Sequence, residues 1–185
     1  MIKVSKTKLE GVLLIKLEPY EDFRGEYVET FNEKLYKETI VKNLKGTIYE
    51  KDGANLRWVE DDISTGEKGV IKGIHGDSRT WKLVQCLFGK FYIIVLNNNP
   101  RSKDFGKWEA FTLSDKNRLQ LLIPPLYGNG HQVLSELDIY HYKQSAYYDL
   151  SSQFTIKWND PKYNFWWPIK NPILSKRDEE GKVVK

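Results

Sequence analysis

The chain has 185 residues and a formal net charge of +4; 40% of its residues are hydrophobic and 29% are charged. This composition fits a single globular domain with a sizeable core, which we place at residues 1–178, with a mobile tail at 179–185. The modest charge, without a Lys/Arg block, argues against a nucleic-acid-binding protein. No apolar run has membrane-spanning length and the N-terminus is no signal peptide, so we expect a cytoplasmic protein that does not associate with membranes. Cys86, the single cysteine, lies in an apolar run and is expected to be a buried thiol.

The N-terminal third contains short strands and the best helix candidate. The run GVLLIKLEPYED (11–22) predicts a strand followed by a Pro-containing turn, and the run DFRGEYVETF (22–31) turns at Arg24-Gly25 and then alternates. On a strand, Tyr27, Glu29 and Phe31 would share one face, with Glu29 either contacting a ligand or pairing with a buried Arg. Asn32 can cap a short helix over 32–40, and a polar loop is expected at 41–55.

From Leu56 onward the pattern predicts one strand after another. Apolar, alternating runs are separated by turn signals such as Asn-Asn-Asn-Pro and Pro-Pro. The expected strands are 56–63, 69–75, 81–88, 90–96, 107–113, 118–123, 131–135 and 138–148. Many short strands with few helices indicate a β-sandwich or barrel.

The stretch 69–89 has particular chemical interest. Read as a hairpin turning at Gly76-Asp77-Ser78, it places His75 and Lys82 on neighbouring strands. An imidazole can move a proton near neutral pH, and a nearby cation can stabilise a developing oxyanion, so this pair suits removal of a proton next to a carbonyl. Taken alone, however, a single His at a strand end is usually an ordinary structural residue.

Other candidates are weaker when taken singly. The three His lack the clustered spacing of a metal site, and no metal is expected. On the strand 138–148, Tyr140, Tyr142 and Gln144 share one face, as a packed sheet face would also require. Asp160 precedes a proline and has the character of a turn residue.

Taken together, motifs from 22 to 178 resemble the dTDP-4-dehydrorhamnose 3,5-epimerase (dTDP-sugar epimerase) family. DFRG, KGIH, WKLV, FGKWEAFTLS and QLLIPP match family motifs in order. YKQSAYY and WNDPKYNFWWPIKNPILSKRD match two more near the C-terminus. The resemblance implies an all-β, cupin-type double-stranded β-helix (jelly roll) with one short helix near 32–40, and a homodimer that pairs through its N-terminal strands.

The resemblance also implies roles for individual residues. His75 aligns with the general base, Asp160 with the carboxylate that orients it, Tyr142 with the acid on the opposite sugar face, and Lys82 with the cation near the C4 oxygen. Those roles suit epimerisation at C3, C5 or both of a nucleotide-diphospho-4-keto-sugar, without a cofactor. The positions implied to contact substrate are Arg24, Glu29, Lys72, Asn129, His131, Glu60 and Asp62.

Several positions depart from the family pattern. The Arg before Gly-Leu-His is Lys72, and the usual Gln-Asp-Asn is Glu60-Asp61-Asp62, so two amides have become carboxylates. The family's second His is displaced by two residues, to His131, with Asn129 ahead of it. The Gly-Ile-His-Gly-Asp and Gly-Asn-x-His combination is similar to a branch acting on GDP-linked 4-keto-heptoses in capsule biosynthesis.

We therefore predict a nucleotide-sugar epimerase serving surface-polysaccharide or deoxysugar synthesis. One rival is a 3,4-ketoisomerase on the same fold, which would move the carbonyl; the presence of Tyr142 and Lys82 argues against it. The other rival is a non-catalytic jelly roll that binds sugar or nucleotide, which the changes at Glu60, Asp62 and Asn97 keep open.

Overall fold

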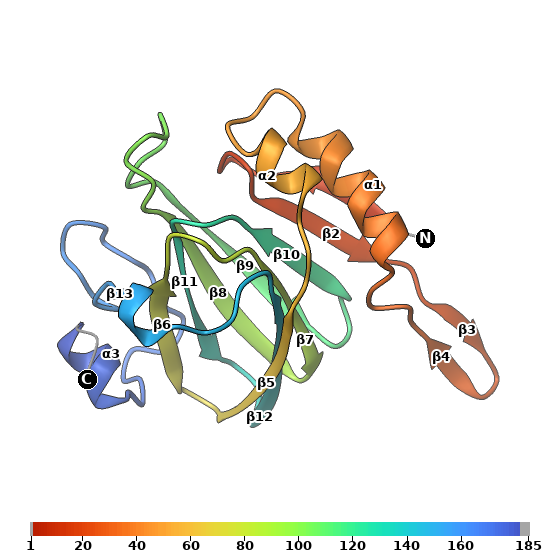
Figure 1. Cartoon of the computed structure of the whole chain (residues 1–185). Coiled ribbons are helices and arrows are strands. Elements are labelled where there is room, and N and C mark those ends of the chain that lie inside the picture. The colour runs from red at the N-terminus through yellow and green to blue at the C-terminus, as the bar shows by residue number, and fades with distance from the viewer. Residues whose placement is uncertain (1, 182–185) are drawn as a thin grey trace.

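The computed structural model describes residues 2–181, and two antiparallel sheets face each other in it around a shared interior (Figure 1). Neighbouring strands of the six-stranded sheet follow the order β1 (Ile2–Lys6), β2 (Leu13–Leu17), β10 (Leu119–Ile123), β7 (Lys82–Phe88), β12 (Leu137–Gln144), β5 (Glu60–Glu67). The five-stranded sheet follows the order β13 (Phe154–Thr155), β6 (Ile71–Gly76), β11 (Tyr127–Val133), β8 (Lys90–Asn97), β9 (Trp108–Ser114). The predicted jelly-roll architecture is confirmed.

The core explains why these segments are strands. Alternate side chains of β8, including Phe91, Ile93 and Val95, fill the space between the sheets and are fully buried. Ile94 points to the other side of the five-stranded sheet, where the C-terminal segment covers it with Trp167. Because β8 is covered on both faces, its sequence is continuously apolar rather than alternating.

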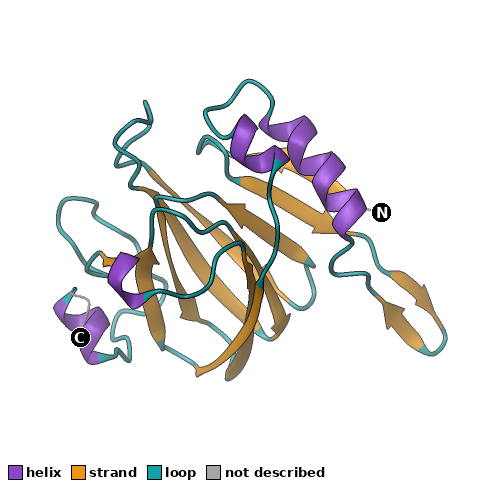
Figure 2. Ribbon diagram, in the orientation of Figure 1, coloured by secondary structure: helices purple, strands orange, loops and turns teal. Residues whose placement is uncertain are grey.

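Helices lie outside the two sheets (Figure 2). Helix α1 (Glu33–Leu44) begins where predicted, with Asn32 Oδ1 accepting a hydrogen bond from Leu35 N at 3.1 Å. It runs beyond residue 40 because Tyr36, Ile40 and Leu44 continue one buried stripe. The loop expected at 41–55 is therefore partly wrong, since α2 (Glu50–Ala54) also forms there. The remaining helical turns are η1 (Leu150–Ser152) and α3 (Lys176–Glu180).

The expected hairpin at 69–89 is wrong in its pairing. Strand β6 belongs to the five-stranded sheet and β7 to the six-stranded sheet, so the turn between them carries the chain from one sheet to the other. Within it, Asp77 Oδ1 accepts hydrogen bonds from the backbone of Arg79 at 2.8 Å and Thr80 at 2.7 Å. His75 and Lys82 consequently face each other across the interior instead of lying on paired strands.

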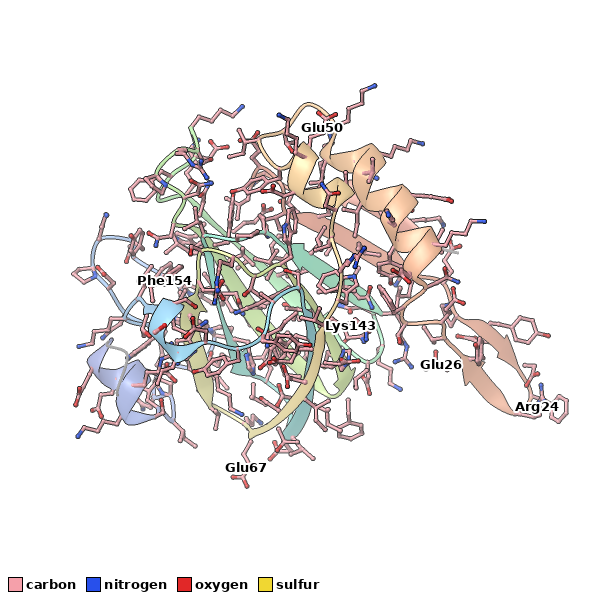
Figure 3. The ribbon with its side chains drawn as sticks, in the orientation of Figure 1. Arg24, Glu26, Glu50, Glu67, Lys143 and Phe154 are labelled. Carbon is pink, nitrogen blue, oxygen red and sulfur yellow. The ribbon has the colours of Figure 1, made fainter. Side chains whose placement is uncertain are left out.

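A two-stranded hairpin, β3 (Tyr20–Asp22) and β4 (Gly25–Tyr27), projects from the body of the molecule, with Arg24 at its tip (Figure 3). The strand expected through Phe31 ends at Tyr27, so Tyr27, Glu29 and Phe31 do not form one strand face. Glu29 instead accepts a weak hydrogen bond from Asn32 Nδ2 at 3.4 Å.

The C-terminal end packs beside β6. The tail predicted for 179–185 begins inside α3, while residues 182–185 lie outside the described part of the chain. Cys86 is buried, as predicted. In the described residues, no helix combines the length and apolar character needed to cross a membrane.

Candidate active site

A cavity of about 380 Å³ opens between the two sheets. Strands of both sheets, the loop before β13 and helix α3 supply its walls. The lining residues are Ser64, Lys72, His75, Lys82, Asn129, His131, Tyr140, Tyr142, Gln144, Tyr148, Gln153, Ser175, Arg177 and Asp178. The cavity thus collects His75, Lys82, Tyr142, Lys72, Asn129 and His131 from the sequence-based set.

His75 is held by a carboxylate. Its Nε2 lies 2.6 Å from Asp178 Oδ1, and the Asp178 side chain is only 3% exposed. Burial lowers the pKa of His75 below its usual range, although the Asp178 carboxylate opposes that effect. The imidazole is therefore neutral near pH 7 and free to accept a proton, while Asp178 is placed to stabilise the imidazolium that results.

Asp178 is itself fixed by the start of helix α3. Burial alone would raise the pKa of Asp178, but hydrogen bonds from His75, Ser175 and the backbone of Gly73 hold it below its ordinary value. Ser175 Oγ donates to Asp178 Oδ2 at 2.8 Å and also caps the helix. The carboxylate is therefore ionised at neutral pH and cannot turn away from the imidazole without losing these donors.

The approach of β6 to β11 requires glycine beside the base. Gly73 has φ +119°, and a Cβ there would lie 2.4 Å from Gly130 Cα. Both side-chain-free residues let the two strands come close, with His75 in register with Asn129. This local geometry sets where the imidazole enters the cavity.

Lys82 reaches the cavity from the opposite sheet. Its Nζ donates to Asn129 Oδ1 at 3.3 Å, and Asn129 Nδ2 donates to Tyr140 Oη at 3.1 Å. Burial lowers the pKa of Lys82, and the Asp77 carboxylate opposes this effect. Asn129 therefore holds both the amine of Lys82 and the phenol of Tyr140, which belong to the facing sheet.

Tyr142 faces the cavity from the same sheet as Lys82. Burial raises the pKa of Tyr142 to about 12, and the nearby carboxylates of Asp62 and Glu60 add to the shift. The phenol is therefore fully protonated at neutral pH and can act as a proton donor. Because His75 lies in the five-stranded sheet and Tyr142 in the six-stranded sheet, the base and the phenol occupy opposite walls.

His131 is a buried residue of the cavity lining. Its ring stacks on Tyr140 with centroids 4.2 Å apart, and burial lowers the pKa of His131 to about 3. Its Nε2 lies 3.7 Å from Asp138 and has no hydrogen-bond partner among the described residues. Lys72 Nζ donates to Ser64 Oγ at 2.9 Å and to the Thr65 carbonyl at 2.7 Å, so this cation connects β6 of one sheet to β5, the edge strand of the other.

The prediction that Asp160 orients His75 is wrong. Asp160 Oδ1 accepts a hydrogen bond from the backbone of Lys162 at 2.9 Å, within the turn that its Asp-Pro sequence indicates. The carboxylate that reaches the imidazole is Asp178, which is separated from His75 by 103 positions. The family motif ending Leu-Ser-x-x-Asp already contained this residue and was the available signal for it.

Other predicted substrate contacts do not line the cavity. Arg24 is exposed at the hairpin tip and pairs with Asp22, at 2.6 Å between Nη2 and Oδ2. Glu29 is near the start of α1. Glu60 and Asp62 lie on the inner face of β5, where both accept hydrogen bonds from Gln144. Asn97 is the last residue of β8, and its Nδ2 donates to Ser102 Oγ at 2.8 Å.

Sequence reasoning missed cavity residues besides Asp178. Arg177 precedes it on α3, with its Nε donating to Thr155 Oγ1 at 2.9 Å, and adds a cation to the wall. Tyr148 and Gln153 come from the segment between β12 and β13, where no regular pattern identifies them. Among residues 2–181, no three His, Cys, Asp or Glu side chains gather closely enough to hold a metal ion.

A buried histidine–carboxylate pair faces a phenol and an amine on the opposite wall of a jelly roll, and this arrangement is typical of an acid–base isomerase. The site suits removal of a proton from one face of a carbon next to a carbonyl and its return on the other face. Comparison with known proteins gives the particular family. Residues 6–185 match the family model described as dTDP-4-dehydrorhamnose 3,5-epimerase, and the chain belongs to that family.

Individual relatives agree with this assignment. The chain is 32% identical to dTDP-4-dehydrorhamnose 3,5-epimerase of Shigella flexneri, over 97% of this chain and 94% of the relative. It also resembles a Legionella pneumophila epimerase solved in complex with dTDP-4-keto-L-rhamnose, with TM-score 0.87, 30% identity, and coverage of 98% and 92% of the two chains. A 4-keto-6-deoxy sugar epimerase of Streptomyces spheroides superposes with TM-score 0.88 at 25% identity, covering 98% and 87%.

Proposed function

We infer that this chain epimerises a nucleotide-diphospho-4-keto-sugar in deoxysugar biosynthesis. One observation carries the inference: His75, paired with Asp178, faces Tyr142 across a cavity whose walls belong to different sheets. Inversion of a carbon centre needs a base on one face and an acid on the other, which this arrangement supplies. Nucleotide sugars are made in the cytoplasm, and we propose that location for the reaction.

The first step is proton removal. The ketone at C4 acidifies the hydrogens on C3 and C5, and neutral His75 takes one of them, leaving the electron pair delocalised as an enolate with its charge on O4. Lys82 donates a hydrogen bond towards O4, while Asp178 stabilises the imidazolium. A placed electrostatic group of this kind contributes about 10²–10³-fold in rate.

The second step is proton return from the other wall. Tyr142 delivers its phenolic proton to the enolate carbon, which restores the ketone and inverts the centre. The resulting phenolate regains a proton from solvent and the imidazolium loses one, so the protein and the proton count are restored. No cofactor enters this sequence.

Substrate binding uses the cations of the cavity. We assign the cations of Lys72 and Arg177 to binding the diphosphate. We assign Asn129 and His131 to positioning the sugar. Glu60 and Asp62 act on the substrate through Gln144, to which both are hydrogen-bonded. The candidates for the nucleotide are dTDP, GDP, CDP and UDP, which the assay below compares.

Arg24 and Glu29 fit this scheme only with a second copy of the chain. The hairpin that carries Arg24 projects from the body of the molecule (Figure 3). Tyr20, Phe23 and Tyr27 on this hairpin are exposed, Phe23 to 98%. We propose a homodimer in which this hairpin packs on the neighbouring copy and brings Arg24 and Glu29 to its site. A light-scattering mass of one chain at micromolar concentration would refute the dimer.

The test of function is deuterium uptake at C3 and C5, followed by NMR in D₂O across dTDP-, GDP-, CDP- and UDP-4-keto-sugars. We expect uptake with at least one of them, inversion at the exchanging carbon, and no uptake in His75→Asn. A 3,4-ketoisomerase would instead give a product with the carbonyl at C3. Binding without exchange for every member of the panel would leave a non-catalytic binding protein and reject the epimerase.

A further inference from the structure

Gln144 lines the cavity but takes part in neither proton-transfer step of the proposed reaction. It is the last residue of β12, is 4% exposed, and lines the cavity two positions after Tyr142. Its register partners are Glu60 on β5 and Lys82 on β7. The side chain therefore lies between a carboxylate on one neighbouring strand and the amine assigned to O4 on the other.

Two carboxylates fix the orientation of the Gln144 amide. Its Nε2 donates to Glu60 Oε1 at 2.7 Å and to Asp62 Oδ2 at 3.0 Å. An ionised carboxylate only accepts hydrogen bonds, so the amide nitrogen has to face β5. Glu60 is itself held by the backbone N–H of Tyr148, which donates to Oε2 at 3.0 Å.

The same constraint leaves the amide oxygen for the cavity. Gln144 Oε1 receives no hydrogen bond from the residues that the structure describes. This oxygen is also not among the polar atoms that are both fully shielded from solvent and without a hydrogen-bond partner, so it remains accessible from the cavity. Amides at positions 60 and 62, as in the family pattern, could donate as well as accept and would allow either orientation. In this chain, the carboxylates of Glu60 and Asp62 hold the Gln144 amide in one orientation, with Oε1 directed into the cavity as a hydrogen-bond acceptor.

We propose that Gln144 is a specificity-determining residue whose Oε1 accepts a hydrogen bond from the sugar hydroxyl next to the ketone. The inference rests on the proposed function, which places O4 at Lys82, the register partner of Gln144. Of the two ring carbons flanking the ketone of a 4-keto-6-deoxyhexose, only C3 carries a hydroxyl. A phosphate has no donor to offer at neutral pH, and Glu60 and Asp62 repel it from this corner.

The test compares matched ligands that differ by this hydroxyl. We would measure the dissociation constants of dTDP-glucose and dTDP-3-deoxyglucose by calorimetry, and of GDP-mannose and GDP-3-deoxymannose in parallel. The wild type should bind the hydroxylated member of the accepted pair about tenfold more tightly, as the loss of a buried hydrogen bond predicts. Gln144→Leu should bring the ratio within about twofold, because a leucine accepts nothing.

The variant Glu60→Gln/Asp62→Asn tests the orientation itself. It keeps Gln144 but replaces both carboxylates with amides, so the Gln144 amide can adopt either orientation. The preference for the hydroxylated ligand over the deoxy ligand should therefore fall well below that of the wild type. Asp61→Asn is the matched control: it is one position along β5, its carboxylate pairs with Lys143 and His141 on the outer face, and the ratio should not change. Because each ratio compares two ligands on one protein, a general loss of stability does not alter it.

The outcomes separate the two proposals. A wild type that exchanges deuterium on a 4-keto-sugar but binds both members of a pair equally refutes the role of Gln144 alone. A ratio that survives in Gln144→Leu does the same. If no hydroxylated ligand binds and no exchange occurs, the substrate class is wrong and this inference falls with it.

Discussion

Replacing Asp178 with Asn tests the catalytic pair most directly. The change keeps the shape of the side chain but removes the charge that lies 2.6 Å from His75 Nε2. A hydrogen bond between charged groups in a buried site contributes about 1.5–3 kcal/mol, and each 1.36 kcal/mol of barrier is tenfold in rate. The imidazolium that forms as His75 takes the proton therefore loses that stabilisation, and kcat should fall about 10- to 150-fold with a smaller change in KM.

The pH profile gives a second, independent readout. Asp178 favours the imidazolium and opposes the lowering of the His75 pKa by burial. Without the carboxylate the pKa of His75 falls further, so the acid limb of kcat/KM should move to lower pH. Both quantities are measurable from initial rates of inversion between pH 4 and pH 9.

Two controls make the result decisive. Asp160→Asn should keep its rate within about twofold, because Asp160 only closes a turn. Ser175→Ala removes a hydrogen bond to Asp178 while leaving the carboxylate on the imidazole, so its pH profile should follow that of the wild type. An unchanged rate in Asp178→Asn together with a large loss in Asp160→Asn would refute the assignment.

Other perturbations have equally defined outcomes. Tyr142→Phe should keep deuterium exchange at the carbon and lose net inversion, as NMR would follow; equal loss of both would contradict the two-wall mechanism. Gly73→Ala should lower the free energy of unfolding by about 1–3 kcal/mol or more, measured in urea, because a Cβ would collide with Gly130 at φ +119°. Burial raises the pKa of Asp138 to about 6, so the free energy of unfolding should fall as pH rises from about 4 to 6 and Asp138 ionises. In urea titrations, Asp138→Asn should remove up to about 3 kcal/mol of this pH-dependent fall. The same fall in the variant would show that Asp138 is not its source.

Local sequence pattern was sufficient for most strands and for the start of α1. Alternation and turn residues depend on neighbours within a few positions, which is why strands such as β7, β8 and β10 are found close to their expected bounds, whereas β12 ends at Gln144, before the expected residue 148. Helix α1 extends further because Leu44 repeats the spacing of Tyr36 and Ile40. The shared inward face of Tyr140, Tyr142 and Gln144 also follows from a period of two and is confirmed.

Contacts between residues far apart in the sequence were harder to predict from the sequence. The turn after His75 has ordinary hairpin chemistry, and nothing in its residues records that β7 pairs with β10 and β12 instead of β6. Asp160 and Asp178 both lie in family motifs near the C-terminus, and the docking of α3 on β6 is what brings Asp178 to the imidazole. Glu60, Asp62 and Gln144 are unremarkable singly; their meaning comes from cross-strand register.

Because the base and the phenol belong to different sheets, the distance between the two sheets should affect the rate of turnover. Facing sheets stack about 10 Å apart, a gap that one sugar ring can occupy. Phe91 helps to set that gap, since its ring lies 5.1 Å from His131 of one sheet and 5.1 Å from Tyr140 of the other. Side chains that never meet the substrate thereby fix how far a proton travels on each face, and conservative repacking at such positions should alter turnover without disturbing any polar contact.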